Sequence, residues 1–208
     1  MKKNKALSLL MSAVLVAAFG CKTKEKTADE TIENLKSAIA GETIARMKYA
    51  AFARKAKDEG LTQIALLFEA TSKAEGIHAR RGIDVLDQFR VRMDAITPKL
   101  GAKSTKINLE DAIKGESHEI ESMYPDFIKT AEEAKIKEAV TSFNYAFETE
   151  KKHLDLYKDA LDKLEKKDIK AMADTYTVCP KCGNTFPKNG PKNCDICGEA
   201  QSTFIIVK

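Results

Sequence analysis

The sequence has little that would interrupt helices over most of its length. It contains no tryptophan, five prolines and ten glycines in 208 residues, and only Pro98 and Pro125 lie between positions 27 and 167. Alanine, glutamate, lysine and leucine dominate that stretch, and all four are strong helix formers. A mostly helical body is therefore expected, followed by a short segment of different composition.

A basic surface stripe is also missing. The chain has 35 basic and 31 acidic residues, and three of the basic ones are Lys2, Lys3 and Lys5, which leaves 32 against 31 for the remainder. No run of lysine or arginine alternates with aromatic residues, as nucleic-acid-binding surfaces require. The composition therefore argues against a nucleic-acid partner.

Long apolar runs are absent except at residues 6–19, which are fewer than the ~20 needed to span a bilayer. This run follows the N-terminal lysines and ends in small residues before Cys21, and it resembles a bacterial lipoprotein signal. We expect residues 1–20 to be a signal peptide, Cys21 to carry lipid and residues 21–27 to form an unstructured charged tether. The protein would then be exported and lipid-anchored in the cell envelope or periplasm. A secreted protein without lipid and an uncleaved anchor are the alternatives.

Four helices are predicted between residues 28 and 167. They cover residues 29–57, 62–92, 108–130 and 135–166, with Asn108 as a helix cap and a connection at 94–106 that contains Pro98 and Gly101. Two helices in a tight hairpin, a longer connection and two further helices are the layout of a ferritin-like four-helix bundle with one crossover. The fold class is therefore mainly α, with a small C-terminal domain at residues 174–208.

Carboxylates interrupt the apolar stripe of every predicted helix. In the last helix, for example, Phe143, Ala146 and Tyr157 mark the buried face, and Glu150 and His153 fall on it. Burying an unpaired carboxylate costs several kcal/mol, so four helices that each do so need a shared positive charge. The candidate metal ligands are Glu42, Glu75, His78, Glu116, Glu119, Glu150 and His153.

Spacing and residue type favour two iron ions as that charge. Residues three apart on a helix lie on one side of it, so each Glu-x-x-His pair can offer an oxygen and a nitrogen to one site. The pattern is that of di-iron and di-manganese carboxylate bundles, and the ligand types leave manganese open. His118 points away from its neighbours' face and is left out. Tyr49 and Tyr124 are either core residues or hydrogen-bond donors to ligating carboxylates.

The C-terminal segment contains two Cys-x-x-Cys motifs. Cys179 and Cys182 form the first, Cys194 and Cys197 the second, and a glycine follows each. Two such motifs at this distance are a strong signature of one tetrahedral metal site. Two disulfides are the alternative that an export signal would allow. The four thiolates suit iron and zinc alike.

Four segments carry a resemblance to a known family. They are GETIARMKYAAFA (41–53), EGIH (75–78), GESHEIESMYPDF (115–127) and ETEKKH (148–153), and across residues 28–165 the chain resembles the rubrerythrins. The resemblance implies a di-iron bundle and a rubredoxin-like domain whose four cysteines bind iron. It also implies that Glu119 exchanges with His78 as an iron ligand during the redox cycle.

The function implied by this resemblance is a non-haem peroxidase that reduces hydrogen peroxide to water in oxidative-stress defence. Glu119 would carry protons, with Tyr49 and Tyr124 beside the site, and the four-cysteine iron would relay electrons from an unidentified donor protein. The resemblance further implies a homodimer in which each bundle receives electrons from its partner's cysteine domain. The alternatives are a ferroxidase that handles iron, and a non-enzyme with zinc among the cysteines and a structural metal in the bundle.

Overall fold

The structure is a computed structural model that describes residues 19–98 and 100–208, so the predicted signal peptide lies almost entirely outside the described residues. The helical elements are α1 (Phe19–Asp58), α2 (Thr62–Gln88), α3 (Thr105–His118), η1 (Glu119–Met123), α4 (Tyr124–Glu133), α5 (Lys137–Glu165), η2 (Ile169–Ala171) and η3 (Gln201–Thr203). The strands are β1 (Tyr176–Val178), β2 (Thr185–Pro187) and β3 (Ile205–Val207). None of the described helices is both long and apolar enough to cross a membrane.

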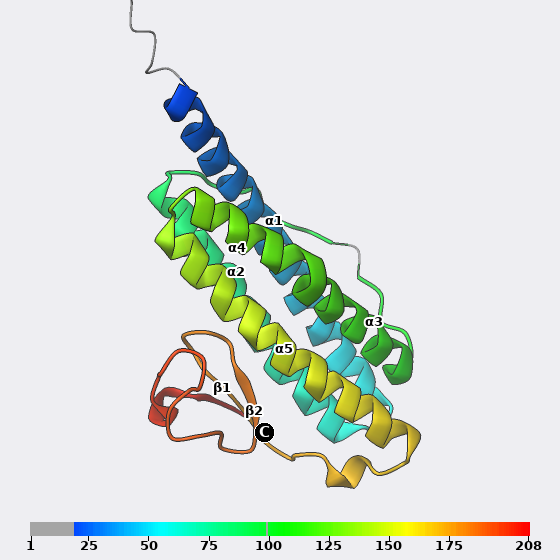
Figure 1. The fold of residues 1–208 in the computed structure, drawn as a ribbon. Helices are drawn as coiled ribbons and strands as arrows, with labels where there is room; N and C mark the ends of the chain where they lie inside the picture. The colour runs from blue at the N-terminus through cyan, green and yellow to red at the C-terminus, as the bar shows by residue number, and fades with distance from the viewer. Residues whose placement is uncertain (1–18, 99) are drawn as a thin grey trace, which may run out of the picture.

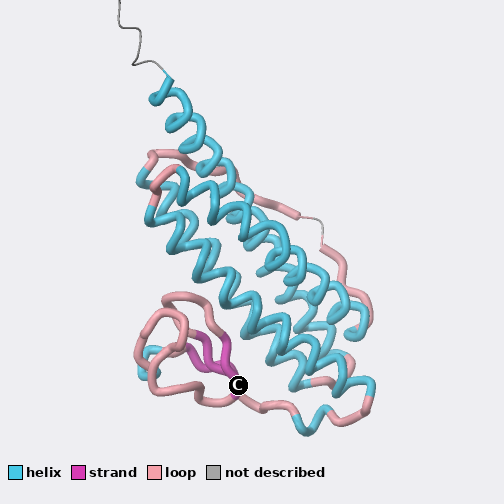
Figure 2. Tube along the Cα trace, viewed as in Figure 1, coloured by secondary structure: helices cyan, strands magenta, loops and turns pink. Residues whose placement is uncertain are grey.

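The long helices form the predicted four-helix bundle with one crossover. Helices α1 and α2 are a hairpin, α3, η1 and α4 follow one another as a third column, and α5 is the fourth (Figure 1). The connection from α2 to α3 runs along the outside of the bundle from one end to the other (Figure 2). The first turns of α1 project beyond the other helices (Figure 1).

Two helix ends differ from the prediction. Helix α1 begins at Phe19 and so includes the backbone of residues 21–27, which were expected to be an unstructured tether. The lysines and the glutamate in that segment favour helix, and α1 can continue through it. Helix α2 ends at Gln88 and not near Arg92, because Arg90 takes a left-handed conformation with φ of 57° and its N–H bonds the carbonyl of Asp87.

The third column begins earlier than predicted and contains an irregular turn. The backbone N–H of Thr105 is capped by the Glu59 carboxylate at 3.1 Å, which starts α3 there. Asn108 is not the cap, because its side chain bonds the backbone of Lys103 in both directions. At residues 119–123 the column widens into a π-helical turn, η1, a feature that is often found at functional sites.

The apolar core of the bundle has two parts. One cluster contains Tyr49, Phe68 and Tyr157, and the other contains Leu35, Tyr124 and Phe143. Along α1, Glu42 lies between Leu35 of the second cluster and Tyr49 of the first. The two clusters thus enclose a polar layer in the middle of the bundle.

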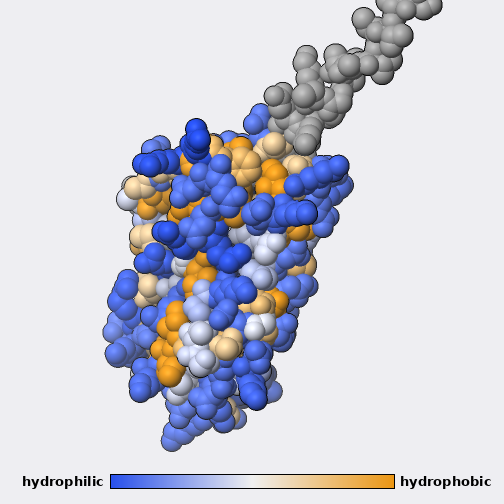
Figure 3. All heavy atoms as spheres, turned by 90° about the vertical axis from the view of Figure 1, so that its left-hand side faces the viewer, coloured by the Kyte–Doolittle hydropathy of each residue, from blue (hydrophilic) through white to orange (hydrophobic). Residues whose placement is uncertain are grey.

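The C-terminal module, residues 174–208, is a small three-stranded antiparallel sheet with loops. Strand β1 is central, in the order β2-β1-β3, and pairs Thr177 with Phe186 on one side and with Ile206 on the other. The rings of Phe186 and Phe204 stack at 5.4 Å beside the cysteines. The module lies against α2 and α5 (Figure 1). The face of the molecule on this side is mostly hydrophilic, with scattered apolar residues (Figure 3).

Candidate metal centres

Six of the seven predicted ligands converge in the polar layer of the bundle. Their ligand atoms form two overlapping groups among the described residues, and within each group the atoms lie within 4.8 Å of one another. The first group is Glu42, Glu75, His78 and Glu150, and the second is Glu75, Glu116, Glu150 and His153. All six side chains are at most 5% exposed. Because Glu75 and Glu150 belong to both groups, they can bridge two metal ions.

The polar atoms of these residues fit a bound cation. Among the described residues, Glu42 Oε2, Glu75 Oε1, both carboxylate oxygens of Glu150 and His153 Nδ1 have no hydrogen-bond partner. The Nδ1 atoms of His78 and His153 lie 2.8 and 2.7 Å from the two oxygens of Glu150, as ligands of a common centre would. Buried polar atoms without partners are rare and costly. Two bound cations would satisfy these carboxylate oxygens and imidazole nitrogens, which would serve as their ligands.

The electrostatics of the layer show the same crowding of negative charge. Burial and the carboxylate of Glu75 raise the pKa of Glu42, and burial and Glu150 raise that of Glu116 well above its usual range. Burial lowers the pKa of His153, but the charges of Glu150 and Glu75 outweigh it and raise the pKa well above its usual range. The layer therefore has a strong affinity for positive charge.

The two predicted tyrosines both donate hydrogen bonds to carboxylates of the layer. The hydroxyl of Tyr49 donates to Glu116 Oε1 at 2.6 Å, and that of Tyr124 donates to Glu42 Oε1. Both rings are buried in the apolar clusters at the same time. The two interpretations of these tyrosines are therefore compatible, since each is a core residue that also fixes one carboxylate.

Glu119 lies beside the six ligands and belongs to neither group. It is the first residue of the π-helical turn and is partly buried. Burial and the carboxylates of Glu42 and Glu116 raise the pKa of Glu119 well above the usual range, so Glu119 interacts electrostatically with the carboxylates of the layer. The exposed His118 stands outside the site, as expected.

The four cysteines form a second centre. Their sulfur atoms lie within 4.8 Å of one another, and Cys179, Cys182 and Cys194 are buried. The distance between the Cys179 and Cys197 sulfurs is 3.4 Å, far from the ~2.05 Å of a disulfide, and all four cysteines are free. The arrangement is that of a tetrahedral thiolate site, and the two-disulfide alternative is not observed.

The two centres are in direct contact through the module. The Nε2 atom of His78 lies 2.9 Å from the backbone carbonyl oxygen of Cys182, and that oxygen also accepts a hydrogen bond from Thr149 at 3.1 Å. The Nε2 atom of His153 lies 3.1 Å from the hydroxyl of Thr185. These contacts join the bundle to the module of the same chain. Residues 166–175 return the module to α2 and α5 within one chain. The homodimer in which the module comes from a partner subunit stays a prediction.

Further polar contacts hold the module in place. The guanidinium of Arg81 donates to the carbonyl of Lys181 at 3.2 Å and lies 4.7 Å from the centre of the Tyr145 ring. Lys152 pairs with Asp195 at 3.4 Å. Sequence reasoning missed these residues, together with Thr149 and Thr185, because each pair is far apart in the chain and no periodic pattern marks it.

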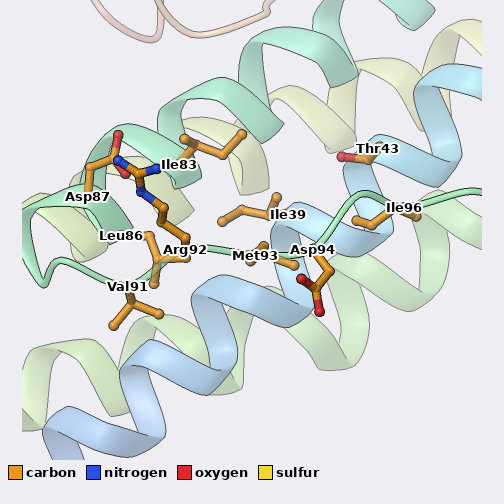
Figure 4. A pocket seen from close by; sticks show the side chains of 10 residues that line it. All are labelled: Ile39, Thr43, Ile83, Leu86, Asp87, Val91, Arg92, Met93, Asp94 and Ile96. Carbon is orange, nitrogen blue, oxygen red and sulfur yellow. The ribbon is translucent and has the colours of Figure 1, made fainter.

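A cavity elsewhere in the bundle is separate from these centres. It has a volume of about 370 Å³ and lies between α1, α2 and the crossover connection, with Ile39, Ile83 and Met93 among its lining residues (Figure 4). Arg92, Asp87 and Asp94 contribute its charged groups. It contains none of the candidate ligands, so it is not part of the metal centres.

Comparisons with known proteins agree with this architecture. The profile of the rubrerythrin family matches residues 33–161. Rubrerythrin-2 of Clostridium acetobutylicum is 36% identical over 176 residues, which are 84% of this chain and 95% of that protein. The fully reduced, all-ferrous structure of nigerythrin superposes with a TM-score of 0.78 at 36% identity, covering 85% of this chain and 86% of that one. A Desulfovibrio desulfuricans bacterioferritin with a diiron site superposes with a TM-score of 0.64 at 20% identity, covering 70% of this chain and 85% of that one, a likeness of fold alone.

Proposed function

Because the chain belongs to the rubrerythrin family, we propose that it is a non-haem peroxidase that reduces hydrogen peroxide to water in defence against oxidative stress. Family membership makes it an oxidoreductase of ferritin-like fold, with a di-iron site in the bundle and an iron site among the cysteines. The observation that carries the peroxidase proposal is the contact between the four-cysteine module and both histidines of the bundle site. Iron storage alone has no need of an electron carrier at that position.

The proposed ligands are the residues that converge in the structure. For the bundle they are Glu42, Glu75, His78, Glu116, Glu150 and His153, and for the module Cys179, Cys182, Cys194 and Cys197. When bound, the iron pair supplies the two electrons that reduce the O–O bond of peroxide.

The residues around the ligands hold groups in position and carry protons. Tyr124 fixes Glu42 and Tyr49 fixes Glu116 through their hydroxyls, which keeps both carboxylates aimed at the metal positions. Each peroxide takes up two electrons and two protons and leaves as two waters. Glu119 is the proposed proton carrier, because it stands beside the ligands and its raised pKa favours the protonated form.

Electrons would return to the bundle through the module one at a time. The route begins at the four thiolates, follows the backbone of Cys182 to its carbonyl and crosses the hydrogen bond to His78. The upstream donor is a separate protein. A homodimer is also proposed, on family resemblance, in which the module of one subunit serves the bundle of its partner.

Oxidation kinetics test the proposed reaction. The reduced, iron-loaded protein is mixed anaerobically with hydrogen peroxide and, separately, with oxygen. Peroxide should oxidise it faster, and faster oxidation by oxygen would establish the ferroxidase alternative instead. Glu119→Ala should slow the reaction with peroxide and leave the circular dichroism spectrum unchanged. If Glu119→Ala reacts at the wild-type rate, Glu119 is not the proton carrier.

We further propose that the chain is exported and anchored through lipid on Cys21. The support is the sequence before Cys21, which resembles a lipoprotein signal. Mass spectrometry of the membrane-purified protein should find an N-terminal diacylglyceryl cysteine at position 21. The Cys21→Ala variant should lose membrane association, and a wild-type protein that starts before Cys21 would refute the anchor.

A further inference from the structure

The outer ring nitrogen, Nε2, of both bundle histidines has its hydrogen-bond partner in the C-terminal module. Among the described residues, neither Nε2 atom has a partner in the bundle. His78 reaches the carbonyl of Cys182 at 2.9 Å, and His153 reaches the hydroxyl of Thr185 at 3.1 Å. Both histidines come from the bundle, on α2 and α5, whereas both of their partners come from the module that lies against these helices (Figure 1).

The chemistry of these partners shows that the outer ring nitrogen of each histidine acts as a hydrogen-bond donor. A carbonyl oxygen can only accept, so Nε2 of His78 must be the N–H that donates to Cys182. The hydroxyl of Thr185 can donate or accept, but its proton is directed at the carbonyl of Gly183 at 3.1 Å, which leaves its oxygen to accept from His153. In both rings Nε2 thus points outward to the module, and Nδ1 faces the carboxylates of the layer, where it would bind metal.

Hydrogen bonds of this kind govern how well a histidine binds metal. A partner on the outer nitrogen holds the ring in its binding orientation, and losing it typically lowers metal affinity roughly 10–100-fold. Here the partner groups belong to a separate folded unit that has its own metal site. The bundle alone therefore leaves its two histidines without these bonds.

We propose that Thr185 is a positioning residue for His153, and that the four-cysteine module sets the metal affinity of the bundle in addition to delivering electrons. Thr185 acts on one metal position only, the one formed by Glu75, Glu116, Glu150 and His153. The position that contains His78 depends on the Cys182 carbonyl, which no side-chain substitution removes. This inference rests on the proposed ligand assignment and is independent of the peroxidase reaction.

The test measures metal binding and not turnover. Full-length protein with iron in the four-cysteine site and a bundle freed of metal by a chelator is titrated with Mn²⁺ by equilibrium dialysis. Thr185→Val removes the hydroxyl and nearly preserves side-chain volume. One of the two Mn²⁺ ions should then bind roughly 10–100-fold more weakly, with the other unchanged. The visible absorption of the four-cysteine iron reports that the module is still folded.

Three further variants make the outcome decisive. Thr185→Ser keeps the hydroxyl and should restore binding. Thr203→Val is the matched control, because Thr203 donates to a carbonyl within the module, at Ala200, and is exposed. His153→Ala should abolish one Mn²⁺ site, and binding of both ions by that variant would overturn the ligand assignment itself. Wild-type binding by Thr185→Val, equal weakening of both ions, or failure of Thr185→Ser to rescue would overturn the role of Thr185.

Discussion

Gly183 is the position in the module where one added methyl group would separate the two metal centres. It follows the first Cys-x-x-Cys motif with a φ of +83°, and a Cβ atom there would lie 2.4 Å from Nε2 of His78. Non-bonded atoms settle at about 3.5–4.0 Å, so the motif and the histidine would have to separate by about 1 Å or more. The ring of His78 is buried and held by Glu75 and Glu150, and we therefore expect the module to move.

The size of the effect follows from the contacts at Cys182. A shift of about 1 Å would lengthen its 2.9 Å hydrogen bond with His78 beyond the ~3.2 Å limit and would weaken the bond from Thr149 as well. Two such bonds contribute about 1–3 kcal/mol together. When alanine replaces glycine, the left-handed backbone of residue 183 destabilises the folded module by a further amount of about 1–2 kcal/mol.

Gly198 provides the matched control. It follows the second motif with a φ of +75°, and no atom lies within 4 Å of the position its Cβ would take. Gly198→Ala therefore carries the same backbone cost without the collision. The difference in electron-transfer rate between Gly183→Ala and Gly198→Ala therefore reports the contact between the module and His78 alone.

Anaerobic stopped-flow absorbance measures the consequence. Reduced protein is mixed with peroxide, and the return of ferric absorption at the four-cysteine iron reports electron flow into the bundle. Gly183→Ala should slow this step roughly tenfold or more, in line with the effect of misplacements of about 1 Å elsewhere, and Gly198→Ala should behave as wild type. Equal rates in the two variants would refute the inferred route through His78.

Three other predictions concern packing and metal content. Gly82→Ala should lower the free energy of unfolding by about 1–3 kcal/mol, because its Cβ would lie 2.7 Å from Ile39. The Cβ of Gly41→Ala would meet nothing within 4 Å, so this variant should raise the free energy of unfolding by up to ~1 kcal/mol. Equal shifts of the two melting temperatures would contradict this packing. Glu150→Gln should weaken the binding of both bundle metals because Glu150 belongs to both ligand groups, whereas Glu42→Gln should weaken the binding of one. Elemental analysis after dialysis measures the metal that each variant retains, and identical losses would refute the assignment of Glu150 to both metal positions. Iron-loaded protein should be red in the ferric state through its four thiolates, and a colourless protein after iron loading would remove the electron-transfer proposal.

The bundle site could be predicted because its residues conflict with their surroundings in the sequence itself. Glu75, His78, Glu150 and His153 interrupt apolar stripes at helical spacing, so burial and convergence follow from the periodicity. Glu119 shares this spacing with Glu116 but lies outside the six converging ligands. The π-helical turn that begins at Glu119 changes the register of the helix. The residue types at positions 119–123 give no sequence signal that predicts this turn.

The sequence by itself predicted the four-helix bundle, seven candidate ligands and the four-cysteine centre, because each depends on spacing within one helix or one short segment. The structure reduced the seven candidates to the six that converge. Only the tertiary structure decided that the two centres touch and how they do so. His78 and Cys182 are 104 residues apart, and the groups that meet are a ring nitrogen and a backbone carbonyl. Every residue has such a carbonyl, so its role arises only when the module folds back and docks on the bundle.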